Sequence, residues 1–169
     1  MNNIGVEQFI ADTMDEIVGI KAIIDKDPLS EIVPYLNKYS IIKVSGTLET
    51  AYKTIITDIT TQGCSSIQPQ NFISYSILES SKNPSYNNIC STLVHFDKNW
   101  YNSFKCQVSS LPNKNLVLDS LDKINKARNT FAHGGNPMNN INSIIHDYTH
   151  AKIIIEILDS ICFGSVLDV

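Results

Sequence analysis

One short segment of the chain holds the residue types that RNA cleavage without a metal requires, namely Arg128, Asn129 and His133. Such cleavage needs a base for the 2'-hydroxyl proton, an acid for the leaving 5'-oxygen, and cations for the charge on the phosphate. A histidine, with an unperturbed pKa of about 6.5, can act as base or acid at neutral pH. An arginine stays protonated and presents a planar fork to phosphate oxygens. The segment therefore suggests ribonuclease chemistry: Arg128 would stabilise charge, His133 would move protons, and Asn129 would orient the imidazole or bind phosphate.

The spacing of these residues limits how they can meet. Asn129 and His133 are four residues apart, so they share one face of a helix. Arg128 and His133 are five apart, which is about 140° around the helix at ~100° per residue, so one regular helix does not aim both at one point. Three arrangements stay open: Arg128 reaches round the helix end, the turn before Gly134 re-aims His133, or two copies of the segment pair across a two-fold axis.

Two further residues are candidates for substrate binding. Lys126 shares a helical face with His133 and would add a phosphate contact, whereas Glu49 would pair with Arg128 and orient it. Each also has a simpler interpretation, because exposed lysines and glutamates are usually solvated. The same holds for the whole segment: Arg128 and His133 suit the last turn of any helix, and Asn129 suits a C-terminal turn.

A second histidine pair has the spacing of metalloprotease zinc ligands. His146 and His150 are four residues apart, but Asp147 stands where the catalytic glutamate is needed, and no third ligand follows at a suitable spacing. Tyr148 lies on the predicted core face, so we expect both histidines at the surface. We therefore expect no metal and, since the sequence has no glycine-rich phosphate loop, no cofactor.

The charge of the chain restricts how it can bind nucleic acid. The 169 residues carry a formal net charge of -4, which excludes a general nucleic-acid coat because phosphate binding depends on lysine and arginine. A local basic cleft stays compatible with that total, since the field in a cleft depends on the charges nearby. One short stretch of the chain provides the local positive charge that such a cleft needs, from Lys114, Lys123, Lys126 and Arg128.

The composition predicts a folded, cytoplasmic protein. The hydrophobic share of 43% is enough for a packed core. Cys64, Cys90, Cys106 and Cys162 form no Cys-x-x-Cys pair, which indicates buried free thiols in a reducing compartment rather than a zinc or redox site. The first residues, MNNIGVEQF, have no basic region followed by an apolar run, so no secretion signal is expected. The apolar runs are too short to cross a membrane.

Helical periodicity dominates the chain and predicts an all-α antiparallel helical bundle, in a single domain over residues 1–169. Residues 1–28 hold a first helix that we interpret as an N-terminal addition. The other expected helices lie over residues 34–63, 69–80, 86–111, 113–133 and 139–161.

The second of these helices leads to two specific expectations. Its core face is predicted to carry Leu36, Tyr39, Ile42, Ser45, Leu48, Tyr52, Ile55 and Ile59. Gly46 lies in its interior, where glycine lowers helix stability by about 1 kcal/mol relative to alanine. A glycine at such a position indicates that another backbone approaches the helix closely.

The segment KARNTFAHGG, residues 126–135, resembles the signature of the HEPN superfamily, which is an arginine, usually a polar residue after it, and a histidine four to six positions later. Arg128, Asn129 and His133 match this signature, and they close a penultimate helix that is followed by glycine. Residues 44–52, VSGTLETAY, resemble the second-helix region of members allied to the RiboL-PSP group. The resemblance covers about residues 34–162, and outside the motif it consists of patterned hydrophobicity.

This resemblance implies a HEPN-like four-helix core with extra helices and a homodimer whose two motifs line one cleft. It also implies an endoribonuclease that leaves a 2',3'-cyclic phosphate and a 5'-hydroxyl. A toxin or phage-defence effector fits that activity, with RNA as substrate and an antitoxin or another protein as partner. Two alternatives stay open: a non-catalytic HEPN module that binds RNA or a protein partner, and a structural dimerisation bundle.

Overall fold

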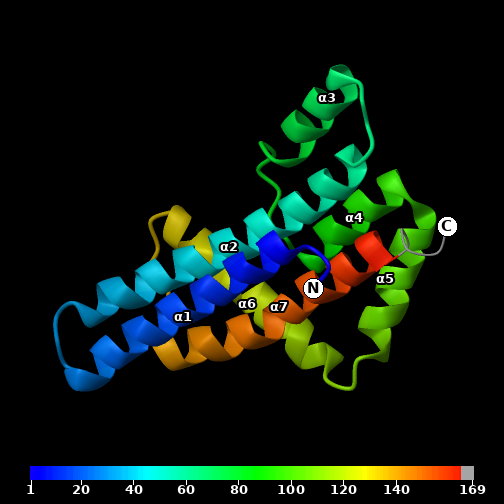
Figure 1. Ribbon diagram of the computed structural model, residues 1–169. Coiled ribbons are helices and arrows are strands. Elements are labelled where there is room, and N and C mark those ends of the chain that lie inside the picture. Colours follow the sequence, from blue (N-terminus) through cyan, green and yellow to red (C-terminus); the bar gives the residue numbers. More distant parts are fainter. Residues whose placement is uncertain (165–169) are drawn as a thin grey trace.

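The computed structural model describes residues 1–164, and within that range the chain folds into seven α-helices (Figure 1). No strand occurs among those residues, so the predicted all-α class is confirmed. The helices are α1 (Ile4–Lys26), α2 (Val33–Thr61), α3 (Ile67–Ile77), α4 (Tyr86–Phe96), α5 (Lys98–Ser110), α6 (Lys114–Ala132) and α7 (Ile141–Gly164).

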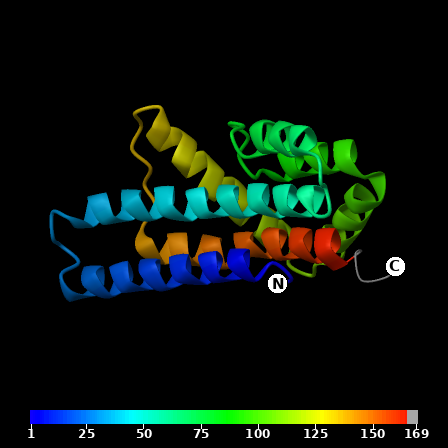
Figure 2. The ribbon, with the colours of Figure 1, turned by 45° about the horizontal axis from the view of Figure 1, so that its top comes forward.

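Three long helices, α1, α2 and α7, run side by side, and α6 packs against α2 and α7 (Figure 2). The short helix α3 packs on α2, whereas α5 packs on α4, α6 and α7. Apolar side chains from the long helices form the shared core, in which Ile17, Leu48 and Ile155 are fully buried. Burial of these apolar faces is what holds α6, the helix with the candidate motif, in place.

Buried hydroxyl groups tie α1 to its two neighbours. The hydroxyl of Tyr148 on α7 donates to the carbonyl of Ile10 at 3.1 Å. The hydroxyls of Thr13 on α1 and Thr47 on α2 lie 2.8 Å apart. A buried hydroxyl is costly unless it is hydrogen-bonded, so these contacts favour one register of the three helices.

The helix predicted over residues 86–111 is in fact two helices, α4 and α5, which meet at Asp97. The backbone of Asp97 is extended, with a φ of -155°, and its carboxylate accepts the backbone N–H of Asn99 at 2.6 Å. Aspartate is among the residues that helices favour at this starting position. The continuous apolar spacing on both sides of Asp97 concealed the break.

The core face predicted for α2 is wrong at two positions. Tyr39 and Ile42 are 49% and 40% exposed, whereas Ile41 and Val44 are buried. The helix is therefore rotated, so that α1 and α7 pack on the face of Ile41, Val44 and Leu48. The close backbone approach predicted at Gly46 is also wrong, because a Cβ atom there would meet nothing within 4 Å.

Several other expectations about the chain can be compared with the described residues. None of the four cysteines, all within residues 1–164, forms a disulfide. Only Cys162 is buried and Cys106 is exposed, so the prediction of burial is wrong for Cys106. α1 contributes Ile17 to the shared core, and its interpretation as an addition to a four-helix core stays a prediction. Within residues 1–164, no helix combines the length and hydrophobicity that crossing a membrane requires.

We expect Tyr148→Phe to lower the free energy of unfolding by about 1 kcal/mol, because it removes one buried hydrogen bond and keeps the packed ring. Urea denaturation followed by circular dichroism measures this change. Tyr35→Phe is the matched control, since Tyr35 is 69% exposed and its loss of a hydroxyl should leave stability unchanged. Equal stability of the two variants would contradict the structural role of the Tyr148 hydroxyl.

Candidate active site at the end of α6

Backbone atoms alone close the C-terminal end of α6. The N–H of Gly134 donates to the carbonyl of Phe131 at 3.0 Å, and the N–H of Gly135 donates to the carbonyl of Thr130 at 2.8 Å. These are the two bonds of a Schellman motif, in which the residue after the cap is left-handed, and Gly134 has a φ of 79°. The carbonyls of Thr130 and Phe131 are thus satisfied without the side chain of Arg128 or of His133.

Gly135 is required for a different reason. A Cβ atom at this position would lie 2.7 Å from Thr130 Cγ2 and 2.9 Å from the Thr130 carbonyl oxygen. Both distances are far below van der Waals contact, so any larger residue would push the turn off the helix end. The two glycines therefore fix where α6 stops and where the chain after His133 begins.

The first turns of α6 pack into the core, whereas its last turn is exposed to solvent. Val117, Leu121 and Ile124 are at most 4% exposed, as the sequence predicted, and they pack into the core. Residues 130–136 are all exposed. In Figure 2 the end of α6 and the loop to α7 stand at the periphery, beyond the layer of long helices. The end of the motif is therefore exposed at the surface, on a helix that the core holds in place.

Arg128 and Asn129 are brought together, and His133 stands apart from them. Nη1 of Arg128 donates to Oδ1 of Asn129 at 3.3 Å, and both side chains are half-buried. His133 is exposed and has left the helical backbone conformation, with φ of -93° and ψ of 19°. Within residues 1–164 no recorded hydrogen bond or ion pair joins Arg128 to His133. The amide therefore orients the guanidinium rather than the imidazole.

The two predicted substrate-binding residues have partners of their own. Lys126 is exposed and lies 2.6 Å from Asp122, and this hydrogen bond raises the pKa of the Lys126 ammonium group. Lys123 pairs with Asp119 at 2.7 Å in the same way. Both lysines therefore stay charged at neutral pH, but each is partly compensated by an aspartate. The local positive field is weaker than a count of the lysines suggests.

Glu49 is engaged elsewhere in the fold. Its Oε1 atom lies 2.6 Å from Nζ of Lys53, and this buried lysine also donates to the carbonyls of Leu78 and Ser80. The predicted pairing of Glu49 with Arg128 is not formed. Glu49 instead helps to hold the segment after α3 against α2.

The second histidine pair lies on the exposed side of α7, as predicted. The rings of His146 and His150 have centroids 4.5 Å apart. Nδ1 of His146 lies 3.4 Å from Oδ1 of the buried Asp147, which also accepts a hydrogen bond from Ser120 at 3.2 Å. Searching residues 1–164 for three or more side chains able to hold one metal ion finds none.

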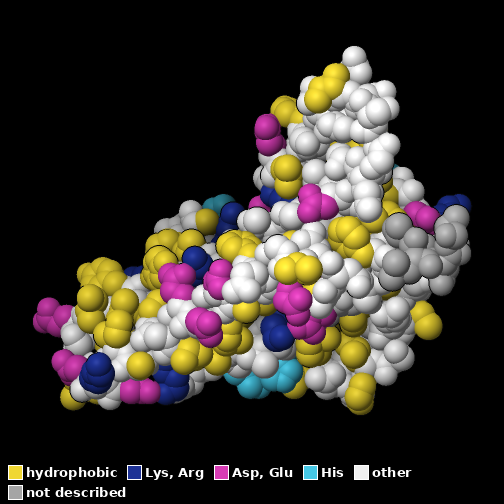
Figure 3. Space-filling view, in the orientation of Figure 1, with side chains coloured by type: hydrophobic (Ala, Val, Ile, Leu, Met, Phe, Trp, Pro, Cys, Tyr) yellow, Lys and Arg dark blue, Asp and Glu magenta, His cyan; other side chains and the backbone are white. Residues whose placement is uncertain are grey.

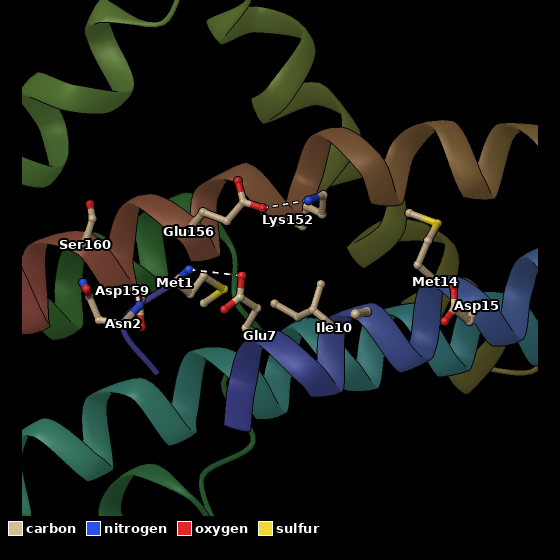
Figure 4. Close-up of a pocket in the computed structure, with 11 residues that line it drawn as sticks. Met1, Asn2, Glu7, Ile10, Met14, Asp15, Lys152, Glu156, Asp159 and Ser160 are labelled. Atoms are coloured by element: carbon tan, nitrogen blue, oxygen red, sulfur yellow. Dashed lines mark hydrogen bonds and ion pairs between the residues drawn. The ribbon is translucent and has the colours of Figure 1, made fainter. Parts of the chain in front are cut away.

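A hollow of about 680 Å³ lies between α1 and α7 (Figure 4). Two ion pairs line it: the N-terminal amine lies 3.3 Å from Glu7, and Lys152 lies 2.7 Å from Glu156. None of the motif residues lines it. This hollow therefore does not compete with the end of α6 as the candidate site.

One residue near the motif was missed by the sequence reasoning. Asn125 lies one turn before Arg128 and Asn129, is only 5% exposed, and has a side-chain Nδ2 atom without a hydrogen-bond partner. A polar residue four positions before Asn129 was visible in the sequence, but its burial depends on the helix packed opposite.

A comparison with protein-family models gives one match, the RiboL-PSP-HEPN family, over residues 8–163. Comparisons with characterised proteins and with solved structures give no significant match. The family model covers α1 to α7 almost completely, and the motif at the end of α6 lies inside it. From its all-helical fold and this match, the chain belongs to the RiboL-PSP-HEPN family.

Proposed function

We propose that this chain is a cytoplasmic, metal-independent endoribonuclease of the HEPN type that acts as a homodimer. One observation carries the proposal: the end of α6 is closed by backbone bonds, which leaves an amide-held guanidinium and an exposed imidazole free for a ligand. An arginine and a histidine needed only as helix caps would have no such freedom. The family match supports an RNA-related function for the same residues.

The chemistry follows from what each side chain can do. An imidazole of His133 takes the proton of the 2'-hydroxyl, and the 2'-oxygen forms a bond to phosphorus. The bond from phosphorus to the 5'-oxygen breaks, and a second His133, in its protonated imidazolium form, donates its proton to that oxygen. Arg128, oriented by Asn129, stabilises the charge on the phosphate oxygens between these events. The products are a 2',3'-cyclic phosphate and a 5'-hydroxyl, and the proton count balances.

A second copy of the chain supplies what one copy lacks. The reaction uses one base and one acid, whereas each motif holds one histidine. Within one chain the Arg128 guanidinium donates to Asn129, whereas the exposed His133 lies at the cap of α6, outside the helical conformation. A two-fold axis beside the end of α6 would bring two imidazoles and two guanidinium groups around one phosphate.

An apolar surface beside the motif suits such a dimer. We call the exposed side chains Ile32, Tyr35, Tyr39 and Ile42 the α2 strip; they are 40% to 69% exposed and recur at helical spacing. Figure 3 shows hydrophobic side chains gathered over the end of the molecule where α1 and α2 are joined. The loop after the motif, residues 136–140, lines a hollow together with Pro34, Asn37 and Lys38 of α2. This loop therefore lies beside the first turns of α2, the part of the chain that also carries the α2 strip.

A toxin or phage-defence effector, held by an antitoxin or another protein partner, is the role that best fits an RNA-cleaving chain of this size. The alternatives are a non-catalytic module that binds RNA or a protein, and a structural dimer. The Lys–Asp pairs on α6 favour a protein-binding module or a structural dimer, because they weaken attraction to RNA. Cleavage and RNA-binding assays distinguish the ribonuclease, the binding module and the structural dimer.

We expect His133→Ala and Arg128→Ala each to lower the rate of RNA cleavage by about 100-fold or more, because one removes the proton carrier and the other removes charge stabilisation. Electrophoresis of a labelled RNA measures the rate, and a chelator should not change it. Growth arrest on expression of the wild type, relieved by His133→Ala, would add a readout in cells.

His95→Ala is the matched control, since His95 is an exposed histidine outside the motif. It should cleave like the wild type. Equal cleavage by all four proteins would remove the nuclease proposal, and RNA binding without cleavage, lost in Arg128→Ala, would favour the binding module.

We expect Tyr35→Glu in the α2 strip to turn the dimer into monomers and to abolish cleavage, because a buried carboxylate opposes association. Light scattering after size-exclusion chromatography measures the mass. Tyr75→Glu on α3 is the control, since Tyr75 is similarly exposed, at 71%, but lies outside the strip. A Tyr35→Glu variant that remains dimeric and active would show that the α2 strip is not the interface.

A further inference from the structure

A lysine without an acidic partner lies in the first turns of α2. Lys38 is half-buried, and its ammonium group lies 5.8 Å from the centroid of the Tyr35 ring. Within residues 1–164 it forms no ion pair with a carboxylate, whereas the next lysine along α2, Lys43, pairs with Glu16 at 2.8 Å. An aromatic ring attracts a cation but does not neutralise it. Lys38 therefore keeps a full positive charge and N–H groups that can donate to an anion.

Lys38 lines a hollow of about 310 Å³ between α2 and the loop that leads from α6 to α7, which passes α2 in Figure 2. Among the residues that the structure describes, no aspartate or glutamate lines this hollow. Its other polar side chains are asparagines, and its apolar surface comes from Pro34, Pro137 and Met138. The volume is near the lower limit of pockets that hold small ligands. The hollow thus combines one uncompensated cation with apolar surface, and it contains no carboxylate that would repel an anion.

Asparagine amides in the loop add hydrogen-bond donors to this hollow. Oδ1 of Asn140 accepts the N–H of Ser143 at 2.9 Å at the start of α7, which leaves the amide NH2 group of Asn140 as a donor. The side chains of Asn136 and Asn139 form no hydrogen bond within residues 1–164. Asn136 is exposed and Asn139 is half-buried, so a ligand can reach both. A lysine beside amide donors is a combination that proteins use to bind the phosphates of nucleic acids.

The chain itself keeps this hollow close to the candidate active site. Asn136 lies three residues after His133, so their Cα atoms are at most about 11 Å apart, at about 3.8 Å per residue. The N–H of Gly135 donates to the carbonyl of Thr130 at 2.8 Å, which keeps the start of the loop against the last turn of α6. Every nucleotide of an RNA strand carries a phosphate. A strand that is cleaved at His133 therefore has further phosphates within reach of the hollow.

We propose that this hollow binds a phosphate that flanks the cleaved one on the same RNA strand, and that Lys38 holds it. The inference rests on the proposed ribonuclease function and gives its substrate a second point of contact. The apolar side chains of the hollow can pack against the ribose or base of the same nucleotide. Because phosphate contacts carry no sequence information, Lys38 positions the strand and does not select its bases.

The first experiment measures how the full chain binds a short labelled RNA whose 2'-hydroxyl groups are methylated, so that the RNA stays intact. In Lys38→Gln, which removes the charge and keeps most of the side-chain length, binding should weaken about fivefold at low salt. The slope of log Kd against log salt concentration should become less steep by about 0.7, the value for one phosphate contact with a single strand. Lys38→Arg keeps the charge and should bind like the wild type.

The second experiment replaces one phosphate of this RNA at a time by a neutral methylphosphonate. At the position that Lys38 contacts, the replacement should weaken binding by the wild type and have no further effect on Lys38→Gln, because both changes remove the same contact. That position also shows how far the hollow lies from the cut. If no position behaves in this way, Lys38 acts only through its general charge or binds free phosphate, and the inference is overturned.

Lys105→Gln on α5 is the matched control. Lys105 also lies over a tyrosine ring, 5.2 Å from the centroid of Tyr101, but it does not line the hollow and should not affect RNA binding. Unchanged binding by Lys38→Gln, or a loss of the dimer in that variant by light scattering, would overturn the inference and leave the nuclease intact. If the wild type neither binds nor cleaves RNA, the proposed function itself fails.

Discussion

The geometry of the candidate site depends on how one helix ends. In α6 the last carbonyls are satisfied by the N–H groups of Gly134 and Gly135, so no side chain is needed to close the helix. Unpaired backbone groups at a helix end otherwise attract nearby arginine and histidine side chains. Because the glycine N–H groups bind these carbonyls, the Arg128 guanidinium can donate to Asn129 and the His133 imidazole stays exposed.

In α6 the residues that stabilise the fold and the residues proposed to act on RNA lie in different turns of the helix. Val117, Leu121 and Ile124 hold α6 in the core, while the last turn contributes little burial. Arg128 and Asn129 lie between the buried part of α6 and its exposed last turn. Their half-burial restricts their rotamers but leaves both side chains accessible to a ligand. Lys123 and Lys126 are each matched by an aspartate one turn earlier, so in the second half of α6 the positive charge without an acidic partner is that of Arg128. A negatively charged chain can in this way still offer one cationic point to a phosphate.

Much of this architecture follows from local signals in the sequence. The periodic apolar positions of α6 and α7, the proline in the first turn of α2 and the Gly-Gly pair after His133 each act within a few residues, and the structure places these elements as predicted. The partner of Glu49 was local too, since Lys53 lies at the i, i+4 spacing that favours such ion pairs.

Other features depend on which helices meet and could not be predicted in the same way. α2 carries apolar residues on more than one face, and only packing with α1 and α7 decides that Ile41 and Val44 are buried while Tyr39 and Ile42 are exposed. Asp97 breaks a run whose apolar spacing continues on both sides. Asn125 is buried because other elements pack against α6, so the sequence of α6 alone does not reveal that its Nδ2 atom lacks a hydrogen-bond partner.

The most direct test of the account is to mix wild-type protein with His133→Ala protein, allow the subunits to exchange, and measure cleavage as the wild-type fraction falls. If two imidazoles from two copies act on one phosphate, activity follows the square of that fraction, and an equal mixture retains about a quarter of the activity. A linear decrease, with about half the activity retained in an equal mixture, would mean that each copy works alone and would contradict the shared site.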